Sequence, residues 1–272
     1  MPELPEVESV RRQLAPRLVG LAIDRVEADP AMPRYLRPTD AEGLTITSVE
    51  RRGKYLVASL EDALDLILHL GMTGVLRWRD EDGWEPDAYV RASLHMVDPD
   101  GRPAILDFRD VRRFGTLAVT RHGEHDELPT LAALGPEPLG EDFTLAGFAA
   151  ALRATGQQVK PFLLSQRPVA GVGNIYADEA LWRARIHPAS RRVGRARSDR
   201  LHAAIREVLA EAIEREGTTF RDYQMVNGAS GRNAAFLVAY GQEGKPCPRC
   251  ATAMRKTTIG GRGTTYCPGC QR

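Results

Sequence analysis

The first apolar residues of the chain recur at intervals of three and four, the pattern of one helical face. They are Val7, Val10, Leu14 and Leu18. Pro5 suits the first turn of such a helix, and Gly20 suits its end. Because Pro16 has no backbone N–H, we expect a kink or an early end there. The pattern therefore predicts a helix close to the N-terminus.

From about residue 21 to about residue 121, the apolar residues form short runs separated by turn-rich segments. Four of these runs read DLILHL, ASLHMV, PAILDF and GTLAVT, and one separator reads DPDGRP. Short apolar runs bounded by Gly, Pro and Asp predict β-strands. Several such strands in one stretch favour a two-sheet sandwich.

A proline-rich segment then separates this stretch from a helical one. LPTLAALGPEPLGEDF contains three prolines and two glycines, and it predicts an interdomain link. Beyond it, TLAGFAAALRA, KPFLLSQ and NIYADEALWRA each predict a helix, the second with Pro161 near its start. The order along the chain is β-rich, then helical, then a small cysteine module.

The longest helical pattern is SDRLHAAIREVLAEAIEREG. Ser198 or Asp199 suits its N-cap, and Gly217 suits its stop. Residues at helical spacing predict its buried stripe: Leu201, Ile205, Val208, Leu209 and Ile213.

The composition is that of an ordinary soluble protein, with 43% hydrophobic and 27% charged residues among 272. This length suffices for one large domain or two medium ones. No run of about 18 apolar residues is present, so we expect no membrane span. The N-terminus lacks an apolar signal core, so we expect no secretion and no structural disulfides among the four cysteines.

The net charge of +1 hides an uneven distribution. From Lys160 to the end, 19 Lys and Arg residues stand against 9 Asp and Glu residues, whereas the preceding part has 18 against 27. A basic C-terminal half is typical of a protein that meets a polyanion. A solvated surface without any partner would give the same count.

The strongest local signal is a pair of Cys-x-x-Cys motifs. Cys247 and Cys250 form the first pair, Cys267 and Cys270 form the second, and sixteen residues separate the pairs. This spacing predicts a four-thiolate zinc site, which has no open position and is therefore structural. Reduced or redox-paired cysteines are the alternative. The site would hold a hairpin, KTTIGGRGTTY, with Arg262 near its tip as a phosphate or base contact.

Two weaker signals concern glycine and arginine. In VAGVGNIYADEALW, two glycines precede Asn174, which would begin a helix whose free amides can bind an anion. In DVRRFG, the residues Arg112, Arg113 and Phe114 lie on a turn between strands, where an aromatic ring can wedge into a base stack. A plain helix connector and a surface pair beside a core Phe are the alternative interpretations.

Seven segments together resemble one family. PELPEVE, RRGKYL, HLGMTG, DVRRFG, LGPEPL, GVGNIYADEAL and the cysteine hairpin follow in this order. They are similar to those of the bacterial formamidopyrimidine-DNA glycosylases, which remove 8-oxoguanine and ring-opened purines from DNA. The resemblance covers nearly the whole chain. The related endonuclease VIII enzymes usually read Pro-Glu-Gly-Pro at the start rather than Pro-Glu-Leu-Pro.

The resemblance implies an α+β multidomain fold. Residues 1–127 would form an N-terminal catalytic β-sandwich domain with a leading helix, and residues 128–142 the interdomain link. Residues 143–240 would form a helix–two-turns–helix DNA-binding domain. Residues 241–272 would form a four-cysteine zinc finger that holds one structural Zn²⁺ in a β-hairpin.

The resemblance also implies a covalent mechanism at the N-terminus. Met1 would be removed, and the secondary amine of Pro2 would attack the sugar C1′ and form a Schiff base. An α-amino group has a reference pKa near 8 and lysine one near 10.4, so the amine is neutral more often at physiological pH. Glu3 would move protons at the sugar, or merely favour the helix N-terminus. By resemblance, Lys54 supports β-elimination and Arg262 supports δ-elimination.

The same resemblance assigns DNA contacts to further residues. One set would fill the space that the extruded nucleotide leaves: Met72, Arg112 and Phe114. The other would contact the DNA backbone: Lys160 and Asn174, with Arg153 as a looser match nearby.

The chain departs from the family pattern in two places. Asp87 and Tyr89 stand where relatives often have two histidines, so the DNA contact assigned there is in question. The segment after Gly217 lacks the usual Pro-Gly-Tyr-Phe, so lesion preference is expected to differ. Its glycine and serine content predicts a mobile loop.

Two other functions remain open from the sequence. One is an endonuclease VIII-type glycosylase for oxidised pyrimidines, and the other is a non-catalytic zinc-ribbon nucleic-acid-binding protein. On the favoured interpretation, the partner is double-stranded DNA that contains oxidised purines, with no membrane. We expect a monomer in the bacterial cytoplasm, associated with the nucleoid.

Overall fold

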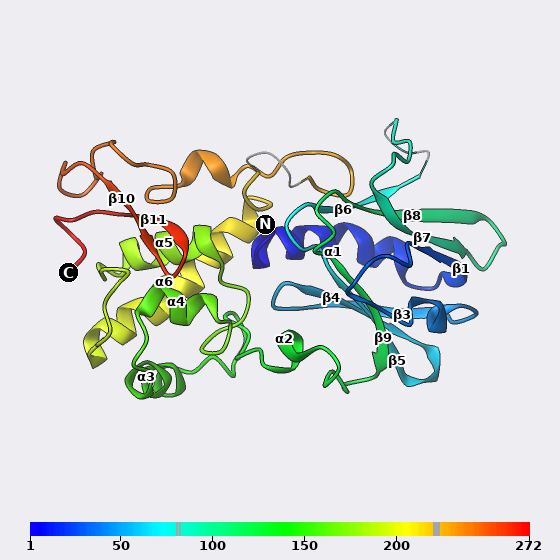
Figure 1. The fold of residues 1–272 in the computed structure, drawn as a ribbon, viewed down its shortest axis with the longest axis horizontal. Coiled ribbons are helices and arrows are strands. Elements are labelled where there is room, and N and C mark those ends of the chain that lie inside the picture. The colour runs from blue at the N-terminus through cyan, green and yellow to red at the C-terminus, as the bar shows by residue number, and fades with distance from the viewer. Residues whose placement is uncertain (80, 82, 220–223) are drawn as a thin grey trace. The chain divides into compact units, whose positions relative to one another are not determined.

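The computed structural model of the chain describes residues 1–79, 81, 83–219 and 224–272. It forms two compact units, which do not follow the order of the chain (Figure 1). The first unit comprises Met1–Ala132 and Arg215–Arg232. The second comprises Ala133–Glu214 and Asn233–Arg272.

The first unit contains a leading helix and nine strands in its described residues. Its helices are α1 (Leu4–Leu18) and α2 (Pro129–Ala132), the latter within the predicted link, and its short 3₁₀ turns are Pro38–Ala41 and Glu61–Ala63. Its strands are β1 (Ala22–Ala28), β2 (Tyr35–Leu36), β3 (Ile46–Arg52), β4 (Tyr55–Leu60), β5 (Leu64–His69), β6 (Gly74–Trp78), β7 (Val90–Val97), β8 (Pro103–Asp110) and β9 (Thr116–Arg121). The four runs that predicted strands are β5, β7, β8 and β9, so these predictions are confirmed.

These strands form two sheets. One has the order β1-β7-β8-β6 and is antiparallel throughout. The other has the order β2-β9-β5-β4-β3, with the short β2 parallel to β9. Apolar residues of both sheets share one buried core, which confirms the predicted sandwich. The prediction succeeds because alternating apolar residues must be buried against a second layer.

Helix α1 completes this core along one side of the sandwich, next to β3 and β4. Its predicted apolar face is buried, with Val7, Val10 and Leu14 each 1% exposed. The helix continues past Pro16 to Leu18 rather than ending early. Pro16 lies in the last turn, where few backbone bonds remain to be lost.

A segment distant in sequence returns to this core. Met225 and Val226 are buried among the residues of the sandwich. Gly228 lies against the guanidinium of Arg77, where an added Cβ would come within 2.9 Å of a nitrogen. Residues 215–232 therefore belong to the first unit, whereas the sequence placed them in the helical domain. The burial of Met225 and Val226 shows this placement. A segment this short has no apolar periodicity from which it could have been predicted.

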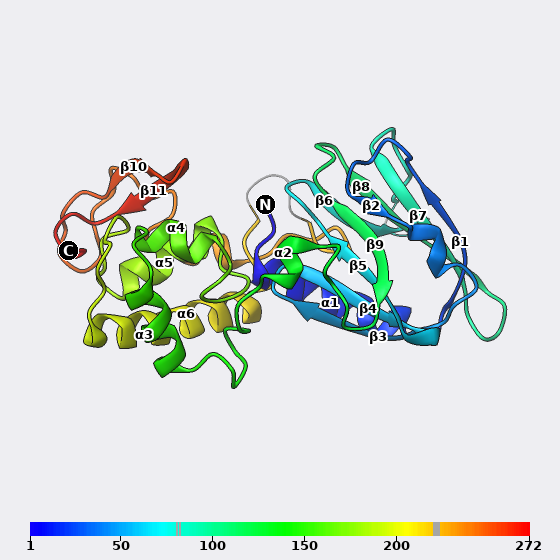
Figure 2. The same cartoon turned by 60° about the horizontal axis from the view of Figure 1, so that its bottom comes forward.

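The second unit is helical, with a terminal hairpin (Figure 2). Its elements are α3 (Leu145–Ala154), α4 (Val159–Leu164), α5 (Asn174–Arg183), α6 (Arg195–Glu214), a 3₁₀ turn at Asn233–Phe236, β10 (Arg255–Ile259) and β11 (Arg262–Tyr266). All four predicted helices are present. None of the described helices is long and apolar enough to cross a membrane.

Helix α6 shows where its sequence pattern succeeded and where it failed. The predicted stripe is buried, with Leu201, Ile205 and Leu209 each 0% exposed. The helix begins at Arg195, so the predicted N-cap at Ser198 or Asp199 is wrong. The Ser198 hydroxyl lies within the first turn and donates to the carbonyl of Gly194 at 3.3 Å. A serine whose hydroxyl bonds a carbonyl of the preceding turn cannot be distinguished in sequence from a serine that caps the helix.

Candidate active site and DNA interface

The N-terminus of α1 is fixed by a reciprocal pair of carboxylates. Glu3 is the N-cap, and its side chain accepts from the backbone of Glu6 while Glu6 accepts from the backbone of Glu3. The second of these bonds measures 2.7 Å from the Glu3 nitrogen to Glu6 Oε2. Pro2 immediately precedes this capping box and is buried, as is Glu3. The box therefore fixes the backbone next to the predicted nucleophile.

Glu6 has a second partner that the sequence did not reveal. Its other oxygen, Oε1, accepts from the backbone N–H of Thr218 at 2.6 Å. A Cβ at Gly217 would lie 2.8 Å from that oxygen, and Gly217 has a φ of +80°. One buried carboxylate thus joins the start of α1 to the start of the segment with the atypical sequence. The three-residue spacing of Glu3 and Glu6 was a signal for the capping box, but nothing local indicated Thr218.

That segment is also closed at its base by backbone and side-chain bonds. Thr218 and Arg232 form an antiparallel bridge, and the Gly231 N–H donates to the hydroxyl of Thr219 at 2.9 Å. Residues 220–223 lie outside the described residues, so the predicted mobility of the loop stays a prediction.

Lys54 lies on the turn between β3 and β4, and a network of charged side chains joins this turn to α1. Glu8 of α1 accepts from Arg11 and from Arg51, and Arg51 in turn donates to the carbonyl of Gly53 at 3.1 Å. Burial raises the pKa of Glu8, but the bonds and charges of Arg11 and Arg51 outweigh it and hold that pKa below its usual value. Lys54 itself is 7% exposed. The network places the Lys54 turn relative to α1.

The predicted hole-filling residues lie on two turns that one buried carboxylate joins. Asp110, which is 0% exposed, ends β8. Its Oδ1 accepts from the hydroxyl of Thr73 at 2.6 Å, and its Oδ2 accepts from the N–H of Gly115 at 2.7 Å. The Thr73 hydroxyl in turn accepts from the N–H of Arg112 at 3.0 Å. The turn that carries Met72 is therefore tied to the turn that carries Arg112.

Backbone packing brings these two turns closer still. A Cβ at Gly71 would lie 2.6 Å from the carbonyl carbon of Phe114, so only glycine fits there. Phe114 is 39% exposed, and its carbonyl accepts from Arg34 at 3.1 Å. The guanidinium carbon of Arg112 lies 5.1 Å from the centre of the Phe114 ring. The interpretation of Phe114 as a core residue is therefore wrong, because its ring lies at the surface.

Asp110 belongs to the motif DVRRFG, but the arginines and the phenylalanine were the only predicted site residues there. Aspartate is favoured at the first position of a turn because it accepts from backbone amides further along. That signal was available in the sequence. The bond from Thr73 was not, because thirty-seven positions separate it from Asp110.

The residues at the two atypical positions form a compact surface cluster. Asp87 accepts from Arg109 at 2.8 Å and from the N–H of Tyr89 at 2.9 Å. The Tyr89 ring lies 5.1 Å from the guanidinium carbon of Arg109 and 5.8 Å from that of Arg91. The site of the missing histidines thus carries two cations and an exposed aromatic ring.

In the helical unit, Lys160 and Asn174 converge on one carbonyl. The ammonium of Lys160 donates to the carbonyl of Gly263 at 3.2 Å, and the Asn174 amide donates to the same oxygen at 3.1 Å. Lys160 is 0% exposed and also bonds Asp178 and Thr264. A phosphate contact by this ammonium would require those bonds to break. The structure shows Lys160 as an anchor of the hairpin, and its expected contact with DNA stays a prediction.

The Asn174 side chain is only partly hydrogen-bonded among the described residues. It is the first residue of α5, whose N-cap Gly173 makes no side-chain capping bond. Its carbonyl oxygen Oδ1 is buried without a hydrogen bond among the described atoms. The amides of this helix N-terminus remain the predicted phosphate contact.

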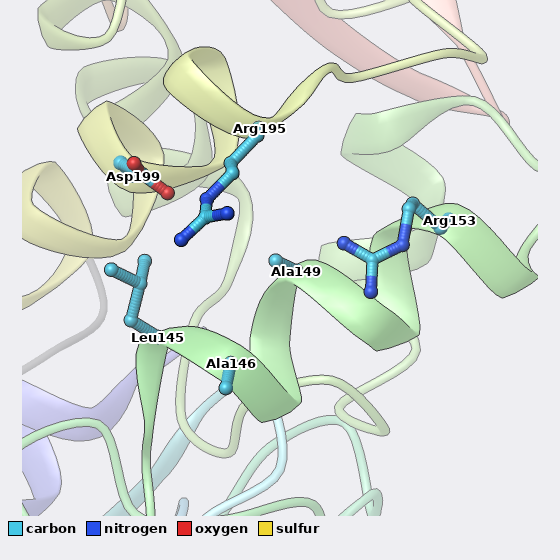
Figure 3. A pocket seen from close by; sticks show the side chains of 6 residues that line it. All are labelled: Leu145, Ala146, Ala149, Arg153, Arg195 and Asp199. Atoms are coloured by element: carbon cyan, nitrogen blue, oxygen red, sulfur yellow. The ribbon is translucent and has the colours of Figure 1, made fainter.

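Arg153 lies on the last turn of α3. It lines a pocket of 380 Å³ between α3 and α6, together with Arg195 and Asp199. Figure 3 shows the guanidinium groups of Arg153 and Arg195 on either side of Ala149. The structure does not bring Arg153 together with Lys160 and Asn174, and its role as a DNA contact stays a prediction.

Comparison with known families covers three consecutive parts of the chain. Residues 1–117 match the formamidopyrimidine-DNA glycosylase N-terminal domain, and residues 134–224 match the helix–two-turns–helix domain of the same enzymes. Residues 244–272 match the zinc finger found in these glycosylases and in isoleucyl-tRNA synthetases. The chain belongs to the formamidopyrimidine-DNA glycosylase family. The zinc-ribbon interpretation, which addressed only the last of these parts, is set aside.

Individual relatives are similar to this chain over nearly their whole length. Formamidopyrimidine-DNA glycosylase from Thermus thermophilus is 45% identical over 276 residues, which cover 100% of this chain and 98% of the relative. That from Deinococcus radiodurans is 44% identical over 284 residues, covering 100% and 97%. As a member of this family, the chain is a DNA glycosylase.

Solved structures of the family share the fold. The crystal structure of the Thermus thermophilus MutM (Fpg) protein has a TM-score of 0.90 at 45% identity, covering 99% of this chain and 98% of that one. The Lactococcus lactis glycosylase, solved as a mutant in complex with Fapy-dG-containing DNA, has a TM-score of 0.88 at 36% identity, covering 100% of both chains. The likeness thus extends to proteins that were crystallised on damaged DNA.

The zinc finger of this glycosylase has the geometry that its cysteine spacing predicted. The sulfur atoms of its four cysteines lie within 4.8 Å of one another. Tetrahedral Zn–S bonds of about 2.3 Å place sulfur atoms about 3.8 Å apart. The observed separations of Cys247 from Cys270 and of Cys250 from Cys267 are 3.9 and 3.5 Å. The N–H of Cys270 donates to the sulfur of Cys267 at 3.4 Å, which favours the thiolate that a metal requires. The module holds one structural zinc ion.

A further buried carboxylate of the glycosylase was not among the predicted site residues. Glu179 of α5 accepts from the backbone N–H groups of Val238, Ala239 and Tyr240 at 2.8–3.1 Å. Burial raises the pKa of Glu179, and the three backbone bonds act against that rise. Glu179 thus fixes the chain where it leaves the atypical segment for the zinc finger. A charged residue within an apolar helical stretch was the available signal.

Proposed function

We propose that this enzyme is a bifunctional glycosylase and AP lyase of base excision repair that excises formamidopyrimidines and 8-oxoguanine through a Schiff base on Pro2. The observation that carries the proposal is the capping box of Glu3 and Glu6, which orders the chain next to Pro2. The relatives support the substrate class, because the Lactococcus lactis enzyme was crystallised with DNA containing Fapy-dG and with DNA containing an N7-benzyl derivative of it.

The chemistry begins once Met1 has been removed and the Pro2 nitrogen is a free secondary amine. This nitrogen attacks C1′, the bond from C1′ to the damaged base breaks, and the base leaves with a proton. Opening of the sugar ring, with Glu3 protonating the ring oxygen, leaves an iminium between Pro2 and C1′. The positive charge of the iminium makes the neighbouring C2′ proton acidic.

Two eliminations then cut the strand. Removal of the C2′ proton breaks the C3′–O3′ bond, and Lys54 is the group we assign to this step. Removal of the C4′ proton breaks the C5′–O5′ bond, and Arg262 is assigned to it as the group that stabilises the departing phosphate. Hydrolysis of the iminium finally regenerates the amine. These residues all belong to this chain, and we propose that it acts as a monomer.

Access to C1′ requires extrusion of the nucleotide from the duplex, which costs a few kcal/mol. Phe114 projects from the turn that Asp110 fixes, and Met72 and Arg112 lie on the same pair of turns. An exposed ring on a fixed turn can take the place of a lost stacking partner. We propose that these three residues compensate the free-energy cost of extruding the nucleotide.

Borohydride trapping on two duplexes tests the proposed substrate. One duplex carries 8-oxoguanine opposite cytosine and the other carries an oxidised pyrimidine in the same sequence. We expect faster formation of the covalent adduct on the first. The reverse ranking would favour the second candidate, an endonuclease VIII-type activity. That candidate has support from the Lactococcus lactis enzyme, which was also solved with DNA containing an oxidised pyrimidine.

Replacement of Phe114 tests the extrusion step. Phe114→Ala is expected to slow 8-oxoguanine excision from duplex DNA by ~10–100-fold, since a factor of ten corresponds to about 1.4 kcal/mol of barrier. Cleavage at a preformed abasic site should change much less, because no base remains to be unstacked there. Both rates are measured on gels under single-turnover conditions.

Val111→Ala is the matched control, because Val111 lies on the same turn and is 40% exposed. It should leave both rates close to those of the unchanged protein. Equal losses of Phe114→Ala on the two substrates, in step with a lower melting temperature, would remove Phe114 from the mechanism.

A further inference from the structure

Lys160 is the most completely buried cationic residue that the structure describes, with 0% exposure. The proposed reaction does not use its ammonium directly. It bonds Asp178 Oδ1 at 2.6 Å, Thr264 Oγ1 at 2.9 Å and the carbonyl of Gly263 at 3.2 Å. An ammonium has three hydrogens, and these three acceptors can take all of them. A buried charge is tolerated only when it is paired in this way, so the geometry of the cluster is strongly constrained.

Asp178 extends the cluster to the backbone of the hairpin. Its second oxygen, Oδ2, accepts from the N–H of Thr265 in β11 at 2.9 Å. Burial raises the pKa of Asp178 to about 6, whereas the charge and hydrogen bond of Lys160 act against the rise. Through its salt bridge with Lys160 and its bond to Thr265, the carboxylate joins α4, α5 and β11 at one point.

The hairpin is held at this point by neutral contacts as well. Asn174 donates to the same Gly263 carbonyl that Lys160 binds. At the turn, a Cβ on Gly260 would lie 2.7 Å from Pro161 Cγ, so the hairpin rests directly on α4. Helices α4 and α5 thus contact the backbone on both sides of Arg262.

The zinc cluster lies at the opposite end of the hairpin. Arg262 pairs with Ile259 next to the turn, whereas Arg255 pairs with Tyr266 beside Cys267. Cys267 lies five positions after Arg262, which corresponds to about 16 Å of extended strand. An anchor at that distance leaves the tip of a two-stranded ribbon free to bend, because isolated hairpins are only marginally stable. The zinc ion alone therefore does not determine where the Arg262 guanidinium lies.

We propose that the buried Lys160–Asp178 pair is a positioning device for Arg262: it fixes the Gly263 carbonyl and the Thr265 amide, and through them it controls the second elimination separately from the zinc ion. This inference rests on the proposed function, because it takes the δ step as the task of Arg262. Neither residue touches the DNA. Their effect on the reaction is transmitted through the backbone of β11.

The test uses a duplex with a preformed abasic site, so that base excision does not contribute. Lys160→Met and Asp178→Asn are compared with the unchanged protein. The β and δ products differ by the sugar fragment on the 3′ end and separate on a gel. With zinc content unchanged, we expect the first cut to slow by no more than ~3-fold and the second by ~10-fold, or about 1.4 kcal/mol.

Asp178→Asn distinguishes positioning from a direct DNA contact. This variant keeps the ammonium of Lys160, so a phosphate contact by Lys160 would survive in it. Under the proposal, both variants form the δ product more slowly. Loss in Lys160→Met alone, together with a shallower salt dependence of DNA binding, would instead show that Lys160 binds phosphate and would overturn the proposal.

Arg79→Met supplies the control for simple loss of stability. Arg79 bonds the buried Asp107 at 2.6 Å in the other unit, so its loss also breaks a buried pair. It should lower the melting temperature without changing the ratio of δ to β product. An unchanged ratio in folded, zinc-loaded Lys160→Met and Asp178→Asn would overturn the proposal. The proposed function would fail separately, through absence of trapping or of δ product in the unchanged protein.

Discussion

A preparation in which Met1 has been removed is expected to form a borohydride-stable adduct with abasic-site DNA through Pro2, whereas a preparation with an extended N-terminus is expected to form none. Only the free amine can form an iminium, because an amide nitrogen has no available lone pair. Loss of a covalent nucleophile costs several orders of magnitude, so strand cleavage should fall by ~10³-fold or more. The adduct is measured by its shifted mobility and mapped by peptide mass spectrometry.

An N-terminal tag and a C-terminal tag provide the matched pair for this experiment. Both proteins contain the same residues, but only the C-terminally tagged one can expose the Pro2 nitrogen. Equal melting temperatures would show that the fold is unchanged. An adduct that maps to Lys54, or equal trapping by both proteins, would contradict the assignment of Pro2.

Replacement of Cys267 by serine is expected to release zinc and to weaken lesion-DNA binding by ~10–100-fold, where each factor of ten is about 1.4 kcal/mol. Cys267 is 0% exposed, so the change also removes a sulfur from the core of the module. Small zinc modules fold only with metal bound, because four cysteines cannot otherwise compensate the entropy of ordering the chain. Without metal, the strand that carries Arg262 loses its anchor at Cys267, and the buried contacts near its other end do not hold Arg262 in place by themselves.

Metal analysis and DNA titration check this prediction on the same samples. Arg262→Ala is the comparison variant, since it should keep its zinc and lose only the contact of the guanidinium with phosphate. Cys267→Ser should therefore bind DNA more weakly than Arg262→Ala. A wild-type protein without zinc, or a metal-free variant that binds DNA normally, would show that the module does not work in this way.

The sequence alone could predict features that depend on neighbours along the chain. The apolar face of α1, the stripe of α6 and the strands of the sandwich follow from periodicity, because burial of one face imposes a repeat on the residues. The two cysteine pairs predicted a zinc site, because tight turns bring residues at that spacing together. The order of seven motifs then indicated the family and its candidate site residues.

Only the tertiary structure shows which side chains position the candidate groups and which residues they bind. Asp110 ties two turns, Glu6 binds Thr218, and Lys160 with Asp178 binds the hairpin. Each of these bonds joins residues that are far apart in the chain, with no repeat to reveal them. A buried carboxylate or ammonium must find partners wherever the fold brings them, so its role depends on three-dimensional proximity rather than on local pattern. The sequence by itself therefore determined the family, the elements and the candidate groups, and the fold determined how those groups are positioned, because long-range polar contacts leave no periodic trace in the chain.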